Sequence, residues 1–195
     1  HLFHLAAIYD LTADEESQIR ANVDGTKHAM QLGVAVKAGC FHHVSSIAAA
    51  GLYPGVFKED MFDEAEGLDD PYFRTKHDSE GMVRREYPRP YRIYRPAIVL
   101  GHSQTGEIDK IDGPYYFFRL IKRMRALLPQ WVPTIGIEGS RLNMVPVDYV
   151  ADAMDWIAHK PGLDGHCFHL TDPAPQRVGD PGAGGAAHVV VEREV

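Results

Sequence analysis

A tyrosine and a lysine four residues apart, Tyr72 and Lys76, are the side chains of this sequence best suited to acid–base chemistry. On a helix, residues four apart lie on one face, one turn from each other. A free phenol has a pKa of roughly 10, and a neighbouring ammonium stabilises the phenolate and lowers that pKa. The pair therefore predicts a tyrosine that exchanges a proton near neutral pH. The alternative interpretation is an ordinary solvated helix face.

Two adjacent hydroxyls, Ser45 and Ser46, end a stretch at Phe41–Ser46 whose apolar start predicts a buried strand. A hydroxyl fixed at a strand end can donate a hydrogen bond to a substrate oxygen. By itself, the same pair of serines also fits a simple turn. The segment 47–70 that follows is mostly irregular, and long loops in compact domains are more often functional than idle.

The elements that must position these residues alternate between strands and helices, which predicts βαβ units and a parallel sheet. We expect strands at 1–7, 41–46, 91–100 and 167–171, and helices at 17–37, 72–86, 115–128 and 147–159. Gly25 lies inside the first helical pattern, where glycine costs about 1 kcal/mol relative to alanine. We therefore expect a close approach to the helix at that point.

Composition excludes several classes of function. A formal net charge of -7 argues against broad nucleic-acid binding, which needs a basic surface. The two cysteines, Cys40 and Cys167, are far apart and favour a reducing, cytoplasmic compartment over a disulfide framework. No apolar run approaches the roughly 20 residues of a membrane span. The histidines are scattered, and His42 and His43 alternate across a strand, so we expect no metal site.

Five short motifs occur in the order found in the extended short-chain dehydrogenase/reductases, which this chain resembles over about residues 1–172. They are His4-Leu5-Ala6-Ala7, Asn22-Val23-x-Gly25-Thr26, Val44-Ser45-Ser46 followed by Gly51, Tyr72-x-x-x-Lys76, and Arg95-Pro96-Ala97. A softer match is Val147-Asp148-Tyr149-Val150-Ala151. The resemblance implies an α/β fold, a partial Rossmann-type doubly wound parallel sheet with a smaller C-terminal substrate-binding region. The implied divisions are 1–101 for the nucleotide and catalytic part, 102–178 for the substrate region, and 179–195 for a low-complexity tail.

The resemblance also implies roles for individual residues. Tyr72 would protonate a carbonyl oxygen as hydride arrives at its carbon, Lys76 would lower the tyrosine pKa and hold the ribose, and Ser46 would bind the same oxygen. Counting back from Gly51 selects Ser46 over Ser45, and Asn22 would support the site. The implied cofactor is NADP or NAD. The implied cofactor-binding residues are Leu5, Ala6, Ala7, Ser45, Tyr72, Lys76, Pro96, Ala97 and Val99.

The family's Gly-x-x-Gly-x-x-Gly turn, which seats the pyrophosphate, does not precede His1. We therefore expect the catalytic half without the N-terminal glycine-rich half, and the choice of NAD or NADP is not readable. The serine stretch lacks the Val-Tyr-Gly ending common in nucleotide-sugar enzymes.

We expect reduction of a carbonyl or acyl thioester on a small hydrophobic substrate, as in the fatty acyl and thioester reductases or sterol dehydrogenase-like members of lipid metabolism. A nucleotide-sugar epimerase or dehydratase and a non-catalytic fragment remain alternatives. We expect no nucleic-acid partner and no integral membrane segment. The assembly state is open and includes a homodimer.

Overall fold

The computed structural model describes residues 1–8, 14–108 and 143–175. Contacts divide the chain into two units, one of residues 1–97 and 149–171, the other of residues 98–148 and 172–195. The helix expected at 115–128 and the tail expected from residue 179 lie outside the described residues. The three-part division expected from the sequence stays a prediction.

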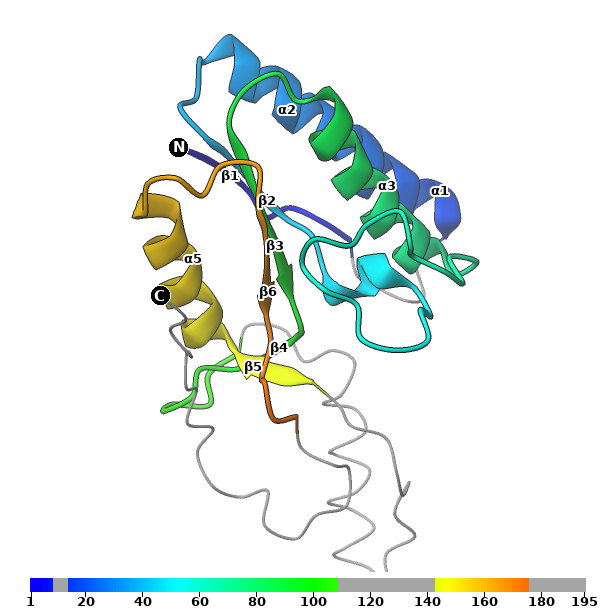
Figure 1. Cartoon of the computed structure of the whole chain (residues 1–195), viewed down its shortest axis with the longest axis vertical. Helices are drawn as coiled ribbons and strands as arrows, with labels where there is room; N and C mark the ends of the chain where they lie inside the picture. Colours follow the sequence, from blue (N-terminus) through cyan, green and yellow to red (C-terminus); the bar gives the residue numbers. More distant parts are fainter. Residues whose placement is uncertain (9–13, 109–142, 176–195) are drawn as a thin grey trace, which may run out of the picture. The chain divides into compact units, whose positions relative to one another are not determined.

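The first unit is built on a four-stranded parallel sheet in the order β1-β2-β3-β6 (Figure 1). Its strands are β1 (Leu2–His4), β2 (Phe41–Val44), β3 (Tyr91–Pro96) and β6 (Cys167–Leu170). The central register aligns Phe41 of β2 with Leu2 on one side and Tyr91 on the other. Because all four strands run in parallel, their carboxyl ends meet at one edge, where α/β proteins bind ligands.

The first helical stretch is continuous but changes its winding. It comprises α1 (Glu15–Gln18), a π-helical segment (Ile19–Asp24) and α2 (Gly25–Ala35). The Asp14 carboxylate caps its start by accepting from the Ser17 backbone N–H at 2.8 Å. A Cβ at Gly25 would meet only the Arg20 carbonyl, at 3.8 Å, so among the described residues the expected close approach there was wrong. The close approach is at Gly33, where a Cβ would lie 2.7 Å from the Tyr87 hydroxyl.

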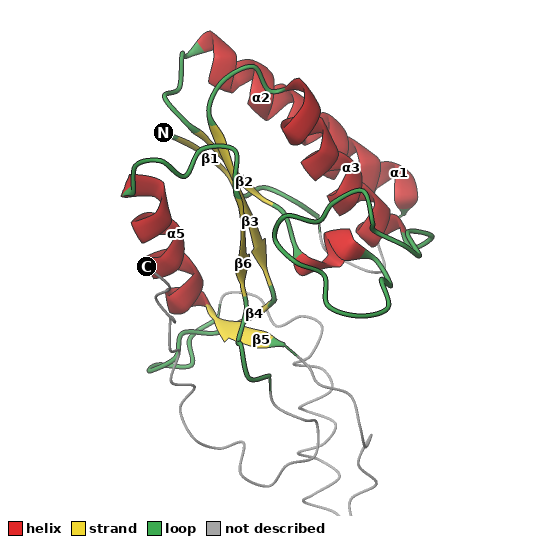
Figure 2. Cartoon of the chain, viewed as in Figure 1, coloured by secondary structure: helices red, strands yellow, loops and turns green. Residues whose placement is uncertain are grey.

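The helix that carries the tyrosine–lysine pair is α3 (Pro71–Glu86). Asp70 caps it by accepting from the backbone N–H groups of Tyr72 and Phe73, and Pro71 occupies the first turn, where its missing N–H costs nothing. α2 and α3 cover one face of the sheet, and α5 (Val147–His159) covers the other (Figure 2). The core under α2 and α3 consists of Met30, Phe41, Val83, Tyr87, Ile93 and Cys167.

The second unit contains a two-stranded parallel sheet of β4 (Ile98–Leu100) and β5 (Met144–Pro146). The single strand expected at 91–100 is therefore two strands with different partners. Ala97 N–H donates to the Leu170 carbonyl of β6, whereas Ile98 N–H donates to the Asn143 carbonyl beside β5. No helix within the described ranges is both long and apolar enough to cross a membrane.

Candidate active site

Three of the predicted cofactor-binding stretches begin where a strand of the first unit ends. Leu5-Ala6-Ala7 follows β1, Ser45-Ser46 follows β2, and Pro96-Ala97 closes β3. Leu5 is 60% exposed, whereas Ala97 is buried. The topology thus brings these stretches to one edge of the sheet. Val99 lies on β4, in the second unit.

Lys76 joins the helix of the acid–base pair to the tip of the serine strand. Its Nζ donates to the Val44 carbonyl, the last of β2, at 3.4 Å. The side chain is buried, and this burial lowers the pKa of the ammonium to about 8, although the Glu80 carboxylate acts in the opposite direction. Tyr72 lies one turn earlier on α3 and is half-buried. Lys76, on the helix that carries Tyr72, therefore reaches the carbonyl two residues before Ser46.

The two serines have different hydrogen-bond roles. Ser45 is buried, and its Oγ donates to Glu80 Oε2 at 2.7 Å. Ser46 begins a 3₁₀ helix (Ile47–Ala50), and its Oγ accepts from the Ala48 N–H at 3.1 Å. An accepting hydroxyl keeps its own proton for donation. In this geometry, the Ser46 hydroxyl can still donate a hydrogen bond to a substrate oxygen, whereas the Ser45 hydroxyl already donates its hydrogen bond to a carboxylate.

Asn22 supports the site from the π-helical segment. Its Oδ1 accepts from the Ile8 N–H at 2.7 Å, and its Nδ2 donates to the Ile8 carbonyl at 2.9 Å and to Thr75 Oγ1 at 3.1 Å. Thr75 immediately precedes Lys76, so the amide connects the segment after β1 with α3. π-helical turns are rare in proteins, and those that occur are often found at functional sites.

A buried ion pair between Glu80 and Arg95 lies behind the serines and was not foreseen. The two residues are fully buried, and Arg95 Nη2 lies 2.6 Å from Glu80 Oε1. Burial tends to raise the pKa of the Glu80 carboxyl, but the hydrogen bonds and charge of Arg95 hold that pKa below its usual range. The sequence did show Glu80 one turn after Lys76, and Arg95 before Pro96. The sequence spacing of Glu80 and Arg95 did not indicate that the two side chains pair between α3 and β3.

Two histidines lie beneath the site on the α2–α3 side of the sheet. His4 Nε2 lies 3.0 Å from Thr26 Oγ1, and its ring stacks on His43 with centroids 5.6 Å apart. His43 is 2% exposed, and burial, reinforced by the Lys76 charge, keeps its pKa well below 6.5. Over the part of the chain that is described, no three His, Cys, Asp or Glu side chains are grouped to hold a metal ion.

Comparison with known proteins identifies the family. A family model described as male sterility protein, an NAD-binding domain, matches residues 1–154. The chain belongs to this family. The resemblance to extended short-chain dehydrogenase/reductases is therefore confirmed.

The chain matches only part of the length of its curated relatives. The chain is 31% identical over 183 residues to the non-canonical nonribosomal peptide synthetase hkm10 of Aspergillus hancockii, and 28% identical over 183 residues to the aldehyde reductase lnbA of Aspergillus flavus. Each match covers 88% of this chain but only 17% and 18% of those proteins.

A solved structure, the terminal R domain from the myxalamid PKS-NRPS biosynthetic pathway, is 28% identical with a TM-score of 0.73. The match covers 90% of this chain and 44% of that one. The Rossmann-type α/β fold expected from the sequence is thereby confirmed.

Proposed function

We propose that this chain carries the catalytic residues of an NAD(P)-dependent reductase that transfers hydride to a carbonyl or acyl thioester of a hydrophobic substrate. One observation supports this most strongly: the Lys76 ammonium, on the same helix face as Tyr72, donates to the last carbonyl of the strand that leads into Ser46. A phenol, an ammonium and a hydroxyl are the groups needed to polarise and protonate a carbonyl oxygen.

The residues present fit the nicotinamide end of such a cofactor. Ala6 and Ala7, small residues after β1, permit close approach to the backbone. An ammonium has three donors, and with one directed to the Val44 carbonyl, Lys76 retains two for ribose hydroxyls. When bound, the cofactor supplies the hydride. Pro96 and Ala97, at the end of β3, complete the edge that would receive it.

The chain's own residues would stabilise and protonate the substrate oxygen. Ser46 donates a hydrogen bond to that oxygen, because its Oγ already accepts from Ala48. Tyr72 Oη gives its proton to the same oxygen as negative charge develops there. The buried Lys76 ammonium stabilises the resulting phenolate. Asn22 keeps Thr75, and with it this turn of α3, in place.

The relatives bear on the substrate class. They include a nonribosomal peptide synthetase and an aldehyde reductase, and a solved relative is a terminal R domain of a PKS-NRPS pathway. We extend this to a substrate presented as an acyl thioester or aldehyde. The free, buried Cys40 and Cys167 fit the cytoplasmic location included in this proposal. The proposal also includes a possible homodimer.

The test is Tyr72→Phe in the full protein, assayed with NADPH against octanal and octanoyl-CoA. We expect turnover to fall by about a hundredfold or more, since a positioned proton donor contributes roughly that amount. NADPH binding, measured by its fluorescence, should persist. The matched control is Tyr91→Phe, at the start of β3 and the opposite end of the strand from the site.

Three results would count against the proposal. Near wild-type reduction by Tyr72→Phe would remove the assigned acid. Equal losses in both variants would remove the evidence for Tyr72 as the acid, because the loss would then come from a disturbed fold. Interconversion of UDP-sugars by the wild-type protein, without net oxidation of NADPH, would favour an epimerase instead.

A further inference from the structure

The carboxyl edge of the sheet contains a fully buried ion pair that the reaction itself does not use. Glu80 lies one turn after Lys76 on α3, and Arg95 is the penultimate residue of β3. Arg95 approaches the carboxylate side-on, with Nε 3.0 Å from Oε2 and Nη2 2.6 Å from Oε1. This two-point geometry fixes the direction of both side chains, which a single contact would not do.

The Glu80 carboxylate is saturated. Besides the two Arg95 bonds, Oε2 accepts from Ser45 Oγ at 2.7 Å and Oε1 accepts from Arg84 Nε at 2.8 Å. Two carboxylate oxygens offer about four acceptor sites, and all four are used. The hydroxyl next to Ser46 is therefore tied to the helix that carries Tyr72 and Lys76.

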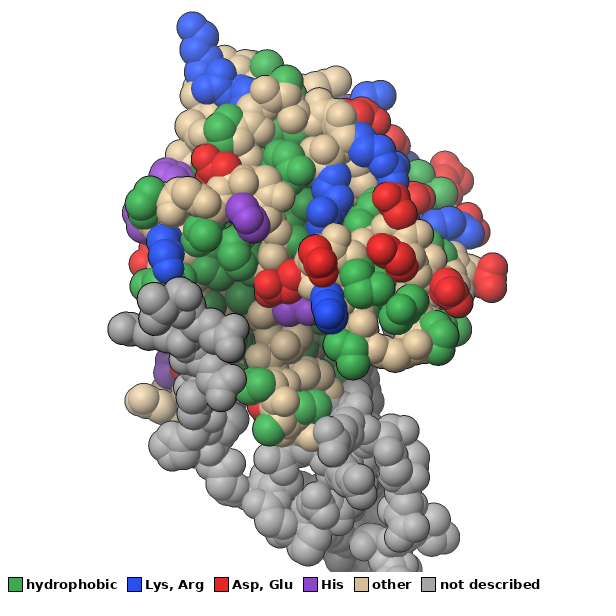
Figure 3. All heavy atoms as spheres, viewed as in Figure 1, with side chains coloured by type: hydrophobic (Ala, Val, Ile, Leu, Met, Phe, Trp, Pro, Cys, Tyr) green, Lys and Arg blue, Asp and Glu red, His purple; other side chains and the backbone are tan. Residues whose placement is uncertain are grey.

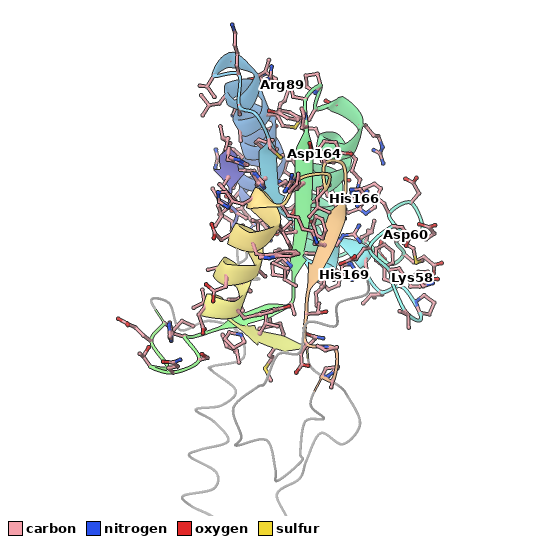
Figure 4. The ribbon with its side chains drawn as sticks, turned by 60° about the vertical axis from the view of Figure 1, so that its left-hand side comes forward. Lys58, Asp60, Arg89, Asp164, His166 and His169 are labelled. Atoms are coloured by element: carbon pink, nitrogen blue, oxygen red, sulfur yellow. The ribbon has the colours of Figure 1, made fainter. Side chains whose placement is uncertain are left out.

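The Arg95 guanidinium is saturated as well. Its remaining three N–H groups are directed to the carbonyls of Lys58 and Met61, at 3.3 and 2.9 Å, and to His169 Nε2 at 3.2 Å. Figure 4 shows Lys58 and His169 from different elements at this end of the sheet. His169 acts as the acceptor here, in keeping with burial and the Arg95 charge lowering its pKa to about 4.

The segment 52–67 is held at this edge by these contacts. Its ends are closed by a bridge between Gly51 and Glu66, and its Phe57 ring lies 5.0 Å from the Arg95 guanidinium carbon. Acidic side chains gather over this segment in Figure 3, and five of them are exposed: Glu59, Asp60, Asp63, Glu64 and Glu66. Glu59 nevertheless anchors the segment to β6, because its Oε1 accepts from the His169 backbone N–H. Arg95 holds the Lys58 and Met61 carbonyls of the segment. The segment is also held by Glu59 on β6 and by the buried Phe62 ring, which stacks on His77 of α3.

Stability alone does not account for such a pair, because a buried ion pair is often no more stable than well-packed apolar residues of similar volume. Its contacts lead to the serine turn, the 52–67 segment and the Tyr72–Lys76 helix. We propose that Glu80 and Arg95 are positioning residues, which hold Ser46 and the 52–67 segment at a fixed place beside the reacting oxygen. This inference rests on the proposed function.

The most informative variant is Ser45→Ala. It removes the hydrogen bond from Ser45 to Glu80 and leaves the Glu80–Arg95 ion pair intact. Its matched control is Ser79→Ala: Ser79 is equally buried at 2% exposure, but its Oγ donates only to the Lys76 carbonyl of its own helix. In the full protein, we expect hydrogen exchange of amides 46–67 to accelerate about tenfold in Ser45→Ala. Exchange in α2, and all exchange in Ser79→Ala, should stay within about twofold of wild type.

Kinetics test whether the tether acts on the reaction. With octanal, kcat of Ser45→Ala should fall about tenfold to a hundredfold, the scale of a misplaced reacting group, while KM for NADPH changes less than about twofold. Ser45→Thr, which keeps the hydroxyl, should recover most of the loss.

Each other result is decisive. A raised KM for NADPH would make Ser45 a cofactor contact and overturn the proposal. Unchanged exchange, or equal effects in Ser79→Ala, would also overturn it. Faster exchange in a protein whose wild type reduces nothing would leave the tether standing and remove the reductase assignment.

Discussion

At the scale of single residues, the titration of Lys76 sets the pH range of the proposed chemistry. Burial lowers the pKa of its ammonium to about 8. Above that pH the positive charge beside Tyr72 is lost, and the phenolate formed during reduction loses its stabilisation. We expect kcat/KM for octanal to decline by about tenfold per pH unit above pH 8. Lys76→Arg, which stays charged below pH 12 or so, should move the decline to higher pH.

The measurement is a pH profile of kcat/KM from pH 6 to 10 for wild type and Lys76→Arg. Lys27→Arg, an exposed position on α2, is the control and should keep the wild-type profile. An inflection at the same pH in Lys76→Arg would mean that another group titrates.

Individual residues of the site differed in how far they could be predicted. Helical spacing places Tyr72 and Lys76 on one face, but their selection as a catalytic pair rested on the order of the family motifs and stays a prediction. The choice of Ser46 over Ser45 rested on the spacing to Gly51 in the family motif. The hydrogen-bond partner that distinguishes Ser45 from Ser46 in the structure lies far away in the sequence. The Ser45 hydroxyl donates a hydrogen bond to Glu80, 35 residues along the chain. No local pattern records such a partner.

At the scale of secondary structure, Asn22 ties the π-helical segment at Ile19–Asp24 to the chain that follows β1. Its amide satisfies both backbone groups of Ile8, which follows β1. Asn22→Ala would leave these groups unpaired, and we expect the free energy of unfolding to fall by about 2–3 kcal/mol. Asn22→Asp should lose at least as much, because a buried carboxylate would face the Ile8 carbonyl oxygen that the amide now binds. Urea unfolding measures both losses.

The control for this prediction is Asp24→Ala, an exposed residue of the same π-helical segment. It should change the free energy of unfolding by less than about 0.5 kcal/mol. A loss of that small size in Asn22→Ala would show that the Ile8 bonds do not stabilise the fold.

The helix expected at 72–86 and the strand expected at 41–46 are α3 (Pro71–Glu86) and β2 (Phe41–Val44). The change of partner between Ala97 and Ile98 was not predicted, because Tyr91–Leu100 alternates as one strand. The division arises from hydrogen bonds to Leu170 and Asn143, which belong to different units. Likewise, the prediction of a close approach at Gly25 was wrong for the described residues. The helix is closely approached at Gly33 instead, by the Tyr87 side chain from the end of α3.

At the scale of the whole molecule, the order of five weak motifs predicted the family, which no single motif could. The same order did not predict how charge and burial are distributed. The first unit buries several histidines, among them His42 and His43, which are 0% and 2% exposed. Burial lowers the pKa of His42 and of His169 to about 4, and that of His43 well below 6.5.

These histidines predict loss of stability in mild acid. An unfolded histidine has a pKa of about 6.5. Below that pH the unfolded chain binds protons that the folded chain excludes, so the free energy of unfolding must fall as the pH falls from about 6.5 towards 4. Each histidine contributes at most about 1.4 kcal/mol per pH unit in this window. Above pH 6.5 this contribution to stability is fully present.

His43→Leu isolates one of these groups, because neither ring nitrogen of His43 has a hydrogen-bond partner among the described residues. Removing the two unpaired nitrogens should raise the free energy of unfolding at pH 7 by about 1 kcal/mol. It should also flatten the decline between pH 6.5 and 5 by one histidine's share. Urea unfolding at pH 7, 6 and 5 gives both values, with His28→Leu, exposed on α2, as the control. A slope unchanged by His43→Leu would mean that His43 binds protons equally in the folded and unfolded protein, and its low pKa in the folded state would have to be abandoned.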